Sequence, residues 1–258
     1  MTLGWLHVFL DVPRDRWEDA LAFWPAATGC TLSDLRGEQG QFATLVPAEG
    51  DAWLKLQAID DGASGVHLDL DSTDRPAAVA ASERLGATRV ATYHGVAVMR
   101  SPGGLPFCHT LLDAPDPRMA RNAPSIADQA CLDIPPRLWD AEVAFWSALT
   151  GRTPEQSDSS EFTRLADQNP AGQARILLQR LDSDSPTVTA HLDFATTNRP
   201  ADQTRHVALG AEVVEEQAWW TVLRAPSGHV YCLTERDPAT GRPRADHFSA
   251  ASFLSAGY

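Results

Sequence analysis

The feature that most constrains this chain is an internal duplication. Residues 11–29, DVPRDRWEDALAFWPAATG, match residues 133–151, DIPPRLWDAEVAFWSALTG, without a gap and at a separation of 122 residues (139 − 17 = 122). Farther along, HLDLDSTDRP matches HLDFATTNRP at a separation of 124 residues (191 − 67 = 124), and RSPGGLPFCH matches RAPSGHVYCL at the same spacing. Self-similarity at a fixed period is the signature of repeated structural modules. The sequence therefore predicts two tandem copies of one module, with a two-residue loop insertion in the second.

The boundary between the copies is expected in the segment 113–125, which is rich in proline, charge and small residues and is typical of a linker. We place the first module at residues 1–120 and the second at 121–258. The residues after Glu235 have a similar composition. We expect them either to pack across a module or a partner chain, or to fray.

Composition narrows the classes of partner. The chain has 258 residues, 43% of them hydrophobic, and a formal net charge of −13, which repels phosphate backbones and anionic lipid surfaces. We therefore expect no nucleic-acid and no membrane partner, and a small molecule as the ligand. The start of the sequence lacks the pattern of a signal peptide, so a cytoplasmic location is expected. The four cysteines form no C-x-x-C pair, which favours free thiols.

Each half reads as a strand, an amphipathic helix and three short strands, repeated once, which is an α+β pattern. In the predicted strand GVHLDLD, alternation indicates that the leucines face the helices and that His67, Asp69 and Asp71 lie on the opposite face. Tryptophans repeated in the helices are expected in the core. The strands near residues 5–11 and 53–57 place further side chains on the same concave face as His67: Trp5, His7, Phe9, Asp11, Trp53, Lys55 and Gln57.

Together these motifs resemble the vicinal-oxygen-chelate superfamily of glyoxalases, bleomycin-resistance proteins and extradiol dioxygenases. The resemblance rests on F-W-x-x-x-x-G at a helix end, H-L-D in a strand, L-G-A after the next helix and P-x-G before the last strand. It implies two βαβββ units per module, curling around a cavity. One chain with two modules could form by itself the cavity that smaller relatives form as a dimer. A homodimer of the whole chain is a further possibility.

The resemblance further implies where a divalent metal would bind. Carried over by position, the ligands fall on the first, fourth, fifth and eighth strands, which gives one set of four candidate residues for each module. Neither set contains a carboxylate, which a hard divalent cation normally requires, so the sequence argues against metal catalysis. His7 and His67 are the best candidate metal ligands, with Cys108 as a softer third. The two sets are His7, Gln57, His67 and Cys108 in the first half, and Gln129, Gln179, His191 and Cys232 in the second.

The leading hypothesis is a small-molecule-binding protein with its site in the first module. The expected ligand contacts are Trp53, Gln57, Asp69 and Cys108, beside His7 and His67. One alternative is a lyase, isomerase or dioxygenase in which the two histidines bind a metal or act as acid and base.

Another alternative is an antibiotic-binding resistance protein, whose aromatic side chains and acidic surface would suit a cationic planar compound. A purely structural role is also open, in which His67 anchors Asp69 within the sheet and the repeated cysteines fill the interior. Lys55 is expected to form a salt bridge with Asp69 or Asp11, or to meet an anionic ligand. The second module is expected to be degenerate, because Gln129 replaces His7 and Arg175 replaces Trp53.

Overall fold

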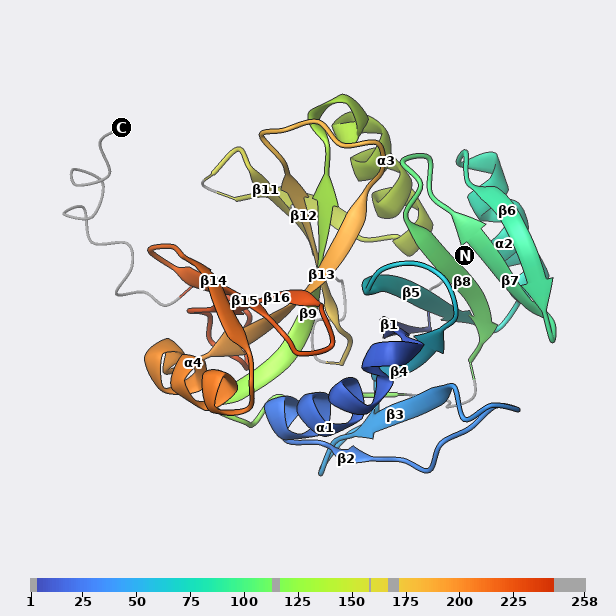
Figure 1. Ribbon diagram of the computed structural model, residues 1–258. Coiled ribbons are helices and arrows are strands. Elements are labelled where there is room, and N and C mark those ends of the chain that lie inside the picture. The colour runs from blue at the N-terminus through green and yellow to red at the C-terminus, as the bar shows by residue number, and fades with distance from the viewer. Residues whose placement is uncertain (1–3, 113–116, 158, 167–171, 244–258) are drawn as a thin grey trace.

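The chain folds into two mixed eight-stranded sheets, one from each half, with two helices per half (Figure 1). The computed structural model describes residues 4–112, 117–157, 159–166 and 172–243. The predicted α+β fold of two tandem modules is confirmed. Most of the predicted linker is described, whereas the last residues of the predicted tail, 244–258, lie outside the described part.

The first module contains two βαβββ units that join along their first strands. Its sheet has the order β2-β3-β4-β1-β5-β8-β7-β6. Strand β1 runs antiparallel to β5 at the centre and parallel to β4, while β5 runs parallel to β8. The elements are β1 (Trp5–Pro13), α1 (Trp17–Thr28), β2 (Thr31–Leu32), β3 (Phe42–Val46), β4 (Leu54–Ile59), β5 (Gly65–Ser72), α2 (Arg75–Arg84), β6 (Thr88–Tyr93), β7 (Val96–Arg100) and β8 (Pro106–Leu111).

The second module repeats this order as β10-β11-β12-β9-β13-β16-β15-β14. A short 3-10 turn precedes the first helix of each module, at Arg14–Arg16 and Pro136–Leu138. The elements are β9 (Ser125–Ile134), α3 (Trp139–Thr150), β10 (Thr153–Gln156), β11 (Phe162–Ala166), β12 (Arg175–Arg180), β13 (Thr189–Thr196), α4 (Arg199–Ala208), β14 (Glu212–Glu216), β15 (Trp220–Arg224) and β16 (Val230–Thr234).

The repeated motifs mark the ends of the helices. Helices α1 and α3 both end before a glycine, Gly29 and Gly151, each with a φ of 69°. This left-handed conformation suits glycine and closes the last turn. Helices α2 and α4 begin after Asp74 and Asn198, whose side chains accept hydrogen bonds from backbone amides three residues later. The duplicated sequence therefore encodes the same helix boundaries twice.

The repeated tryptophans Trp24 and Trp146 join the modules through their cores. Both side chains are fully buried. The Trp24 ring, on α1, lies 5.4 Å from the ring of Tyr231 on β16, and the Trp146 ring, on α3, lies 5.5 Å from that of Phe107 on β8. Each helix of the pair therefore packs against the last strand of the other module. The modules share one hydrophobic core cluster.

The two tryptophans differ in how their indole N–H is satisfied. Trp24 Nε1 donates to the Ser227 hydroxyl at 3.1 Å. The position equivalent to Ser227 is Gly103 (227 − 124 = 103), so Trp146 instead donates to the Glu142 carboxylate at 2.7 Å, and this carboxylate accepts the Gly103 amide at 2.6 Å. A Cβ at Gly103 would lie only 2.6 Å from the Val188 side chain. Burial raises the pKa of Glu142 despite these donors.

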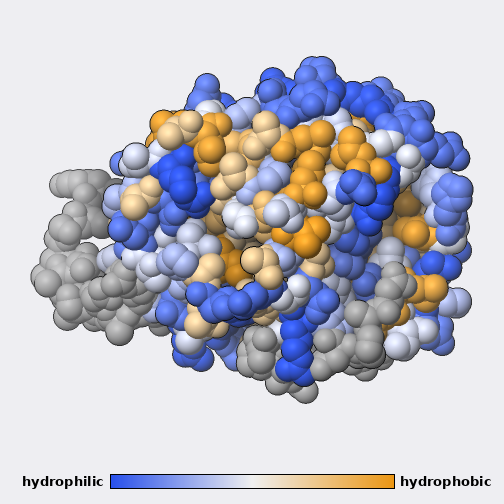
Figure 2. All heavy atoms as spheres, turned by 90° about the horizontal axis from the view of Figure 1, so that it is seen from below, coloured by the Kyte–Doolittle hydropathy of each residue, from blue (hydrophilic) through white to orange (hydrophobic). Residues whose placement is uncertain are grey.

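The surface seen in Figure 2 has apolar side chains gathered across its middle, with hydrophilic residues around the rim. Within the described ranges, no helix has the length and apolar character needed to cross a membrane. Several large hydrophobic side chains are exposed near the edges of the sheets, including Val90 and Tyr93 on β6 and Val213 and Val214 on β14. The proposed homodimer stays a prediction.

Candidate functional site

The three central strands of the first sheet place unusual polar side chains side by side. In the strand register, Asp69 of β5 lies opposite both His7 of β1 and Cys108 of β8. His67, two residues earlier on β5, lies opposite Phe9. Because successive side chains of a strand point to opposite faces, these residues share the face turned away from the helices.

His67 is held by two carboxylates. Its Nδ1 lies 2.8 and 2.9 Å from the two oxygens of Asp11, and its Nε2 lies 3.5 Å from Asp69 Oδ1. Phe9 stacks on the imidazole with ring centroids 4.7 Å apart. The ring is therefore fixed in orientation, with Nδ1 engaged by Asp11 and Nε2 directed toward Asp69.

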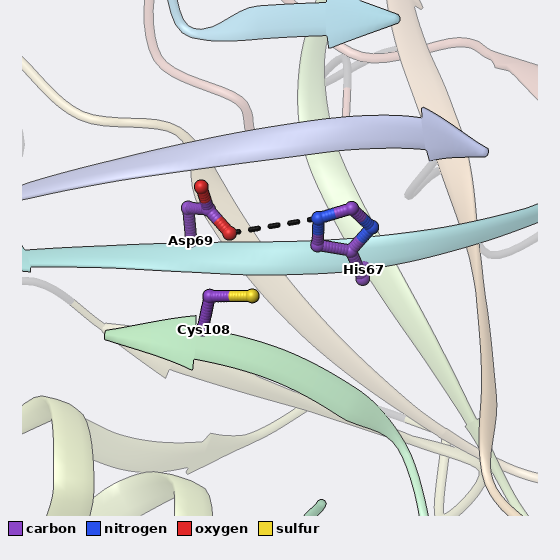
Figure 3. A group of neighbouring side chains, drawn as sticks. All are labelled: His67, Asp69 and Cys108. Carbon is purple, nitrogen blue, oxygen red and sulfur yellow. Dashed lines mark ion pairs between the residues drawn. The ribbon is translucent and has the colours of Figure 1, made fainter. Parts of the chain in front are cut away.

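Asp69, His67 and Cys108 form a compact cluster in which one atom from each lies within 4.8 Å of the others. Figure 3 shows His67 and Asp69 on β5 and Cys108 on the neighbouring β8. All three residues are buried. Asp69 Oδ1 is buried and accepts no hydrogen bond of regular geometry among the described residues, and its ion pair with His67 Nε2 is long at 3.5 Å. A buried carboxylate oxygen with only a long ion pair is incompletely satisfied, so this atom favours a closer ligand.

The cluster strongly perturbs its titratable groups. Burial lowers the pKa of His67, but the Asp11 and Asp69 carboxylates outweigh it and raise the pKa to about 10. Burial raises the pKa of Asp69, yet hydrogen bonding and charge from His67 bring it below its ordinary value. Burial, followed by Asp69, raises the pKa of the Cys108 thiol. Without a bound cation, the cluster is therefore a protonated imidazole beside a carboxylate and a thiol.

The other sequence-predicted residues lie around this cluster rather than in it. His7 Nδ1 lies 3.6 Å from Asp71, and Gln57 is opposite Asp11 in the β1–β4 register. Lys55 Nζ lies 5.4 Å from the centre of the Phe9 ring.

Trp53 is buried and lines a separate pocket of about 310 Å³, together with linker residues such as Met119 and Ala123. This pocket does not include His67 or Gln57 among its lining residues. The structure therefore places Trp53 next to the linker, and the expectation that it contacts a ligand together with these two residues stays a prediction.

The second module repeats the cluster with different surroundings. His191 Nδ1 lies 2.9 Å from Asp133, and its Nε2 lies 3.3 Å from Asp193 and 3.5 Å from the Cys232 sulfur. Burial lowers the pKa of His191, but Cys131 and Asp133 outweigh it, and the pKa is raised well above its ordinary value.

The carboxylate of this second cluster is more fully satisfied. Asp193 accepts a hydrogen bond from Gln129 Nε2 at 2.6 Å, so Gln129, the counterpart of His7, serves as its donor. Gln179, a predicted ligand, instead contacts Glu161 and Cys131.

The first cluster has the donor chemistry of a borderline cation. It offers one imidazole nitrogen, one carboxylate oxygen and one sulfur, which suit Zn²⁺ better than Mg²⁺. Ligand atoms around a tetrahedral Zn²⁺ lie about 3–4 Å apart, which the 3.5 Å separation of His67 Nε2 and Asp69 Oδ1 matches. Asp11 occupies the position of an outer carboxylate that orients a metal-binding histidine. The residues therefore fit such an ion.

Sequence reasoning named Asp69 as a ligand contact but did not assign either carboxylate a role at a metal. It placed the candidate metal positions at His7, Gln57, His67 and Cys108, and it expected Asp69 to contact the small molecule rather than the metal. The signal was the H-x-D spacing itself, because residues two apart on a strand share a face. Alternation also placed Asp11 on this face, but nothing in the sequence paired it with His67, which is 56 residues away.

A family model for a glyoxalase-like domain matches the chain twice, over residues 7–110 and 129–234. These two matches cover well over half of the chain and coincide with the two sheets. No curated protein matches the chain at the sequence level.

Solved structures match across both modules. A Mn(II)-bound glyoxalase from Novosphingobium aromaticivorans aligns with a TM-score of 0.60 and 18% identity, over 90% of this chain and 82% of that one. A variant of homoprotocatechuate 2,3-dioxygenase from B. fuscum gives 0.62 and 14%, over 94% and 73%. The 2,2',3-trihydroxybiphenyl 1,2-dioxygenase from Sphingomonas wittichii gives 0.57 and 14%, over 90% and 89%. At these identities the likeness concerns the fold.

Proposed function

Because this chain belongs to the glyoxalase-like domain family, we propose that its first module binds a small molecule together with a divalent cation held by His67, Asp69 and Cys108. The observation that carries the proposal is the buried Asp69 Oδ1, which accepts no regular hydrogen bond and has only a 3.5 Å ion pair with His67, beside an imidazole nitrogen and a thiol. A cation satisfies this oxygen, and Asp11 keeps His67 Nε2 directed toward it. The structural neighbours include a manganese-bound glyoxalase.

Three protein ligands leave room for a ligand from outside, which is the arrangement of catalytic rather than structural sites. A cation bound there supplies a Lewis acid for a substrate that carries oxygen atoms. The reaction class that fits is a lyase, isomerase or dioxygenase reaction.

Side chains next to the cluster bind and orient the substrate in this proposal. His7 lies opposite Asp69 in the register, and Asp71 lies 3.6 Å from its Nδ1. A histidine oriented by a carboxylate is suited to move a proton at its other nitrogen. Phe9 covers one face of His67, which keeps water from that side of the ring.

The second module serves as the internal control, because its Asp193 is already satisfied. Gln129 donates to one oxygen, His191 approaches the other at 3.3 Å, and the charge of Arg236 also acts on this carboxylate. A positive guanidinium nearby disfavours a second cation. The proposal therefore assigns one cation site per chain.

Titration of the metal-free chain with Zn²⁺, in competition with a chromophoric chelator, tests this proposal. We expect one tight site per chain, and His67→Gln to weaken it by about 100-fold or more, because an inner ligand is lost. The matched change His191→Gln in the second module should leave the affinity within about twofold. Equal loss in both variants, or no tight site in the wild-type chain, would contradict the proposal. Circular dichroism confirms that both variants fold.

A further inference from the structure

Three arginines of the second module converge on one buried carboxylate. Asp128 is the extra residue of a bulge in β9, where the register with β13 shifts between Asp193 and Phe194. Arg236 Nη2 lies 2.7 Å from Asp128 Oδ1, Arg121 Nη1 lies 3.3 Å from Oδ2, and Arg175 Nη1 also bonds Oδ2. The arginines come from the linker, the start of β12 and the segment after β16.

Positive charge exceeds negative charge at this cluster. The Asp128 side chain is fully buried, and the side chains of Arg121, Arg175 and Arg236 are only 8%, 14% and 11% exposed. Three guanidinium groups therefore contact the one Asp128 carboxylate in a largely desolvated cluster. Two other acids act on these arginines more weakly: Asp193 on Arg236 and Asp237 on Arg175. Asp193 is also engaged by His191 and Gln129, and Asp237 accepts hydrogen bonds from Thr240. Buried positive charge that is only partly compensated is costly, so the arrangement favours an additional anion.

One guanidinium nitrogen of this cluster is left without an acceptor among the described residues. Arg121 Nη2 donates to the Gln173 carbonyl, but Arg121 Nε is buried and has no partner among the described residues. By contrast, Arg236 Nε donates to Thr234, and Arg175 Nη2 donates to the Ala239 carbonyl. A buried donor without a partner in a side chain that is more than nine-tenths buried is an independent sign of a missing acceptor.

The first module has none of these charges at equivalent positions. Arg175 corresponds to Trp53 (175 − 122 = 53), and Arg236 corresponds to Leu112 (236 − 124 = 112). Asp71, on the concave face of the first module, corresponds to Ala195 in the second (195 − 124 = 71). The second module therefore also has one negative charge fewer on this face. The first module therefore favours a cationic ligand, and the second favours an anionic one.

We propose that the second module binds a small oxyanion ligand, a molecule with a carboxylate or phosphate group, at Arg121, Arg175 and Arg236. Guanidinium groups present paired N–H donors whose geometry matches carboxylate and phosphate oxygens. The unpartnered Arg121 Nε supplies one of the hydrogen bonds. Arg175, the most exposed of the three, forms the outer edge of the site. Burial, together with repulsion from Arg121 and Arg236, lowers the pKa of Arg175 to about 10 although Asp128 opposes it.

Calorimetric titration of the full-length chain with inorganic phosphate, and separately with malonate, tests this site at constant ionic strength, with chloride as the reference anion. We expect saturable binding of at least one of the two, and the preference between them identifies the kind of oxyanion. Arg121→Gln and Arg175→Gln should each weaken binding by about tenfold or more, because a charge-assisted hydrogen bond is lost. Arg164→Gln, which removes a more exposed arginine paired with Glu155 on the same sheet, should leave binding unchanged.

Absence of saturable binding of both anions, or unchanged affinity in Arg121→Gln and Arg175→Gln, would overturn the proposal. Should a glutamine variant fail to fold, Arg121→Lys keeps the charge and removes the Nε donor, and it is expected to bind more weakly than the wild type; equal affinity would count against the site. His67→Gln should bind the anion normally, because the cation site of the first module is separate. Failure of one proposal therefore leaves the other intact.

Discussion

The affinity of the metal-free chain for Zn²⁺ is expected to rise about 100-fold for each pH unit from about pH 6 to pH 8. The reason is that both His67 and Cys108 hold a proton before the cation binds. The carboxylates of Asp11 and Asp69 overcome burial and raise the pKa of His67 to about 10, and burial raises the pKa of the Cys108 thiol. Each bound cation therefore displaces about two protons.

Competition titrations at several pH values measure this slope, and calorimetry in buffers of different protonation enthalpy counts the released protons directly. Cys108→Ser removes one of the two titrating ligands, so its slope should fall to about tenfold per pH unit. Cys232→Ser, the matched change in the second module, should keep the wild-type slope. A slope near zero in the wild-type chain would mean that the cation does not displace the protons of this cluster.

Replacing Trp146 with alanine is expected to lower the free energy of unfolding by about 3–5 kcal/mol. The side chain is fully buried, and its ring lies 5.1 Å from Phe145 and 5.5 Å from Phe107 of the other module. The substitution opens a cavity and also leaves the buried Glu142 carboxylate without its indole donor. Denaturant unfolding followed by circular dichroism measures the loss.

Tyr93, which is 67% exposed on the edge strand β6, provides the control. Tyr93→Ala should change the free energy of unfolding by no more than about 0.5 kcal/mol. Trp146→Phe keeps much of the volume but removes the hydrogen bond to Glu142, so its effect should lie between those of the two alanine variants. A loss of less than about 1 kcal/mol in Trp146→Ala would show that this tryptophan does not join the two cores.

The fold could be predicted from the sequence because duplication and strand alternation are local patterns. The matching helices, the glycines at their ends and the H-L-D strands recur at fixed spacing, and each has the same local structure in both modules. Alternation also placed His67 and Asp69 correctly on one face. Local patterns of this kind need no knowledge of which strands are neighbours.

Contacts between distant segments could not be predicted in the same way. The pairing of His67 with Asp11 depends on the register of β1 against β5, and alternation fixes only the face of a side chain. The bulge that buries Asp128 has no marker in its own sequence. Three segments far apart in the chain contribute the arginines around it.

The most direct test of the central claim is the absorption spectrum of the chain loaded with Co²⁺ in place of Zn²⁺, because a thiolate bound to Co²⁺ gives a charge-transfer band that an oxygen or nitrogen ligand does not. The proposed site predicts this band in the wild-type chain and in Cys232→Ser, and its loss in Cys108→Ser. A band that persists in Cys108→Ser, or that disappears in Cys232→Ser, would contradict a cation held by His67, Asp69 and Cys108.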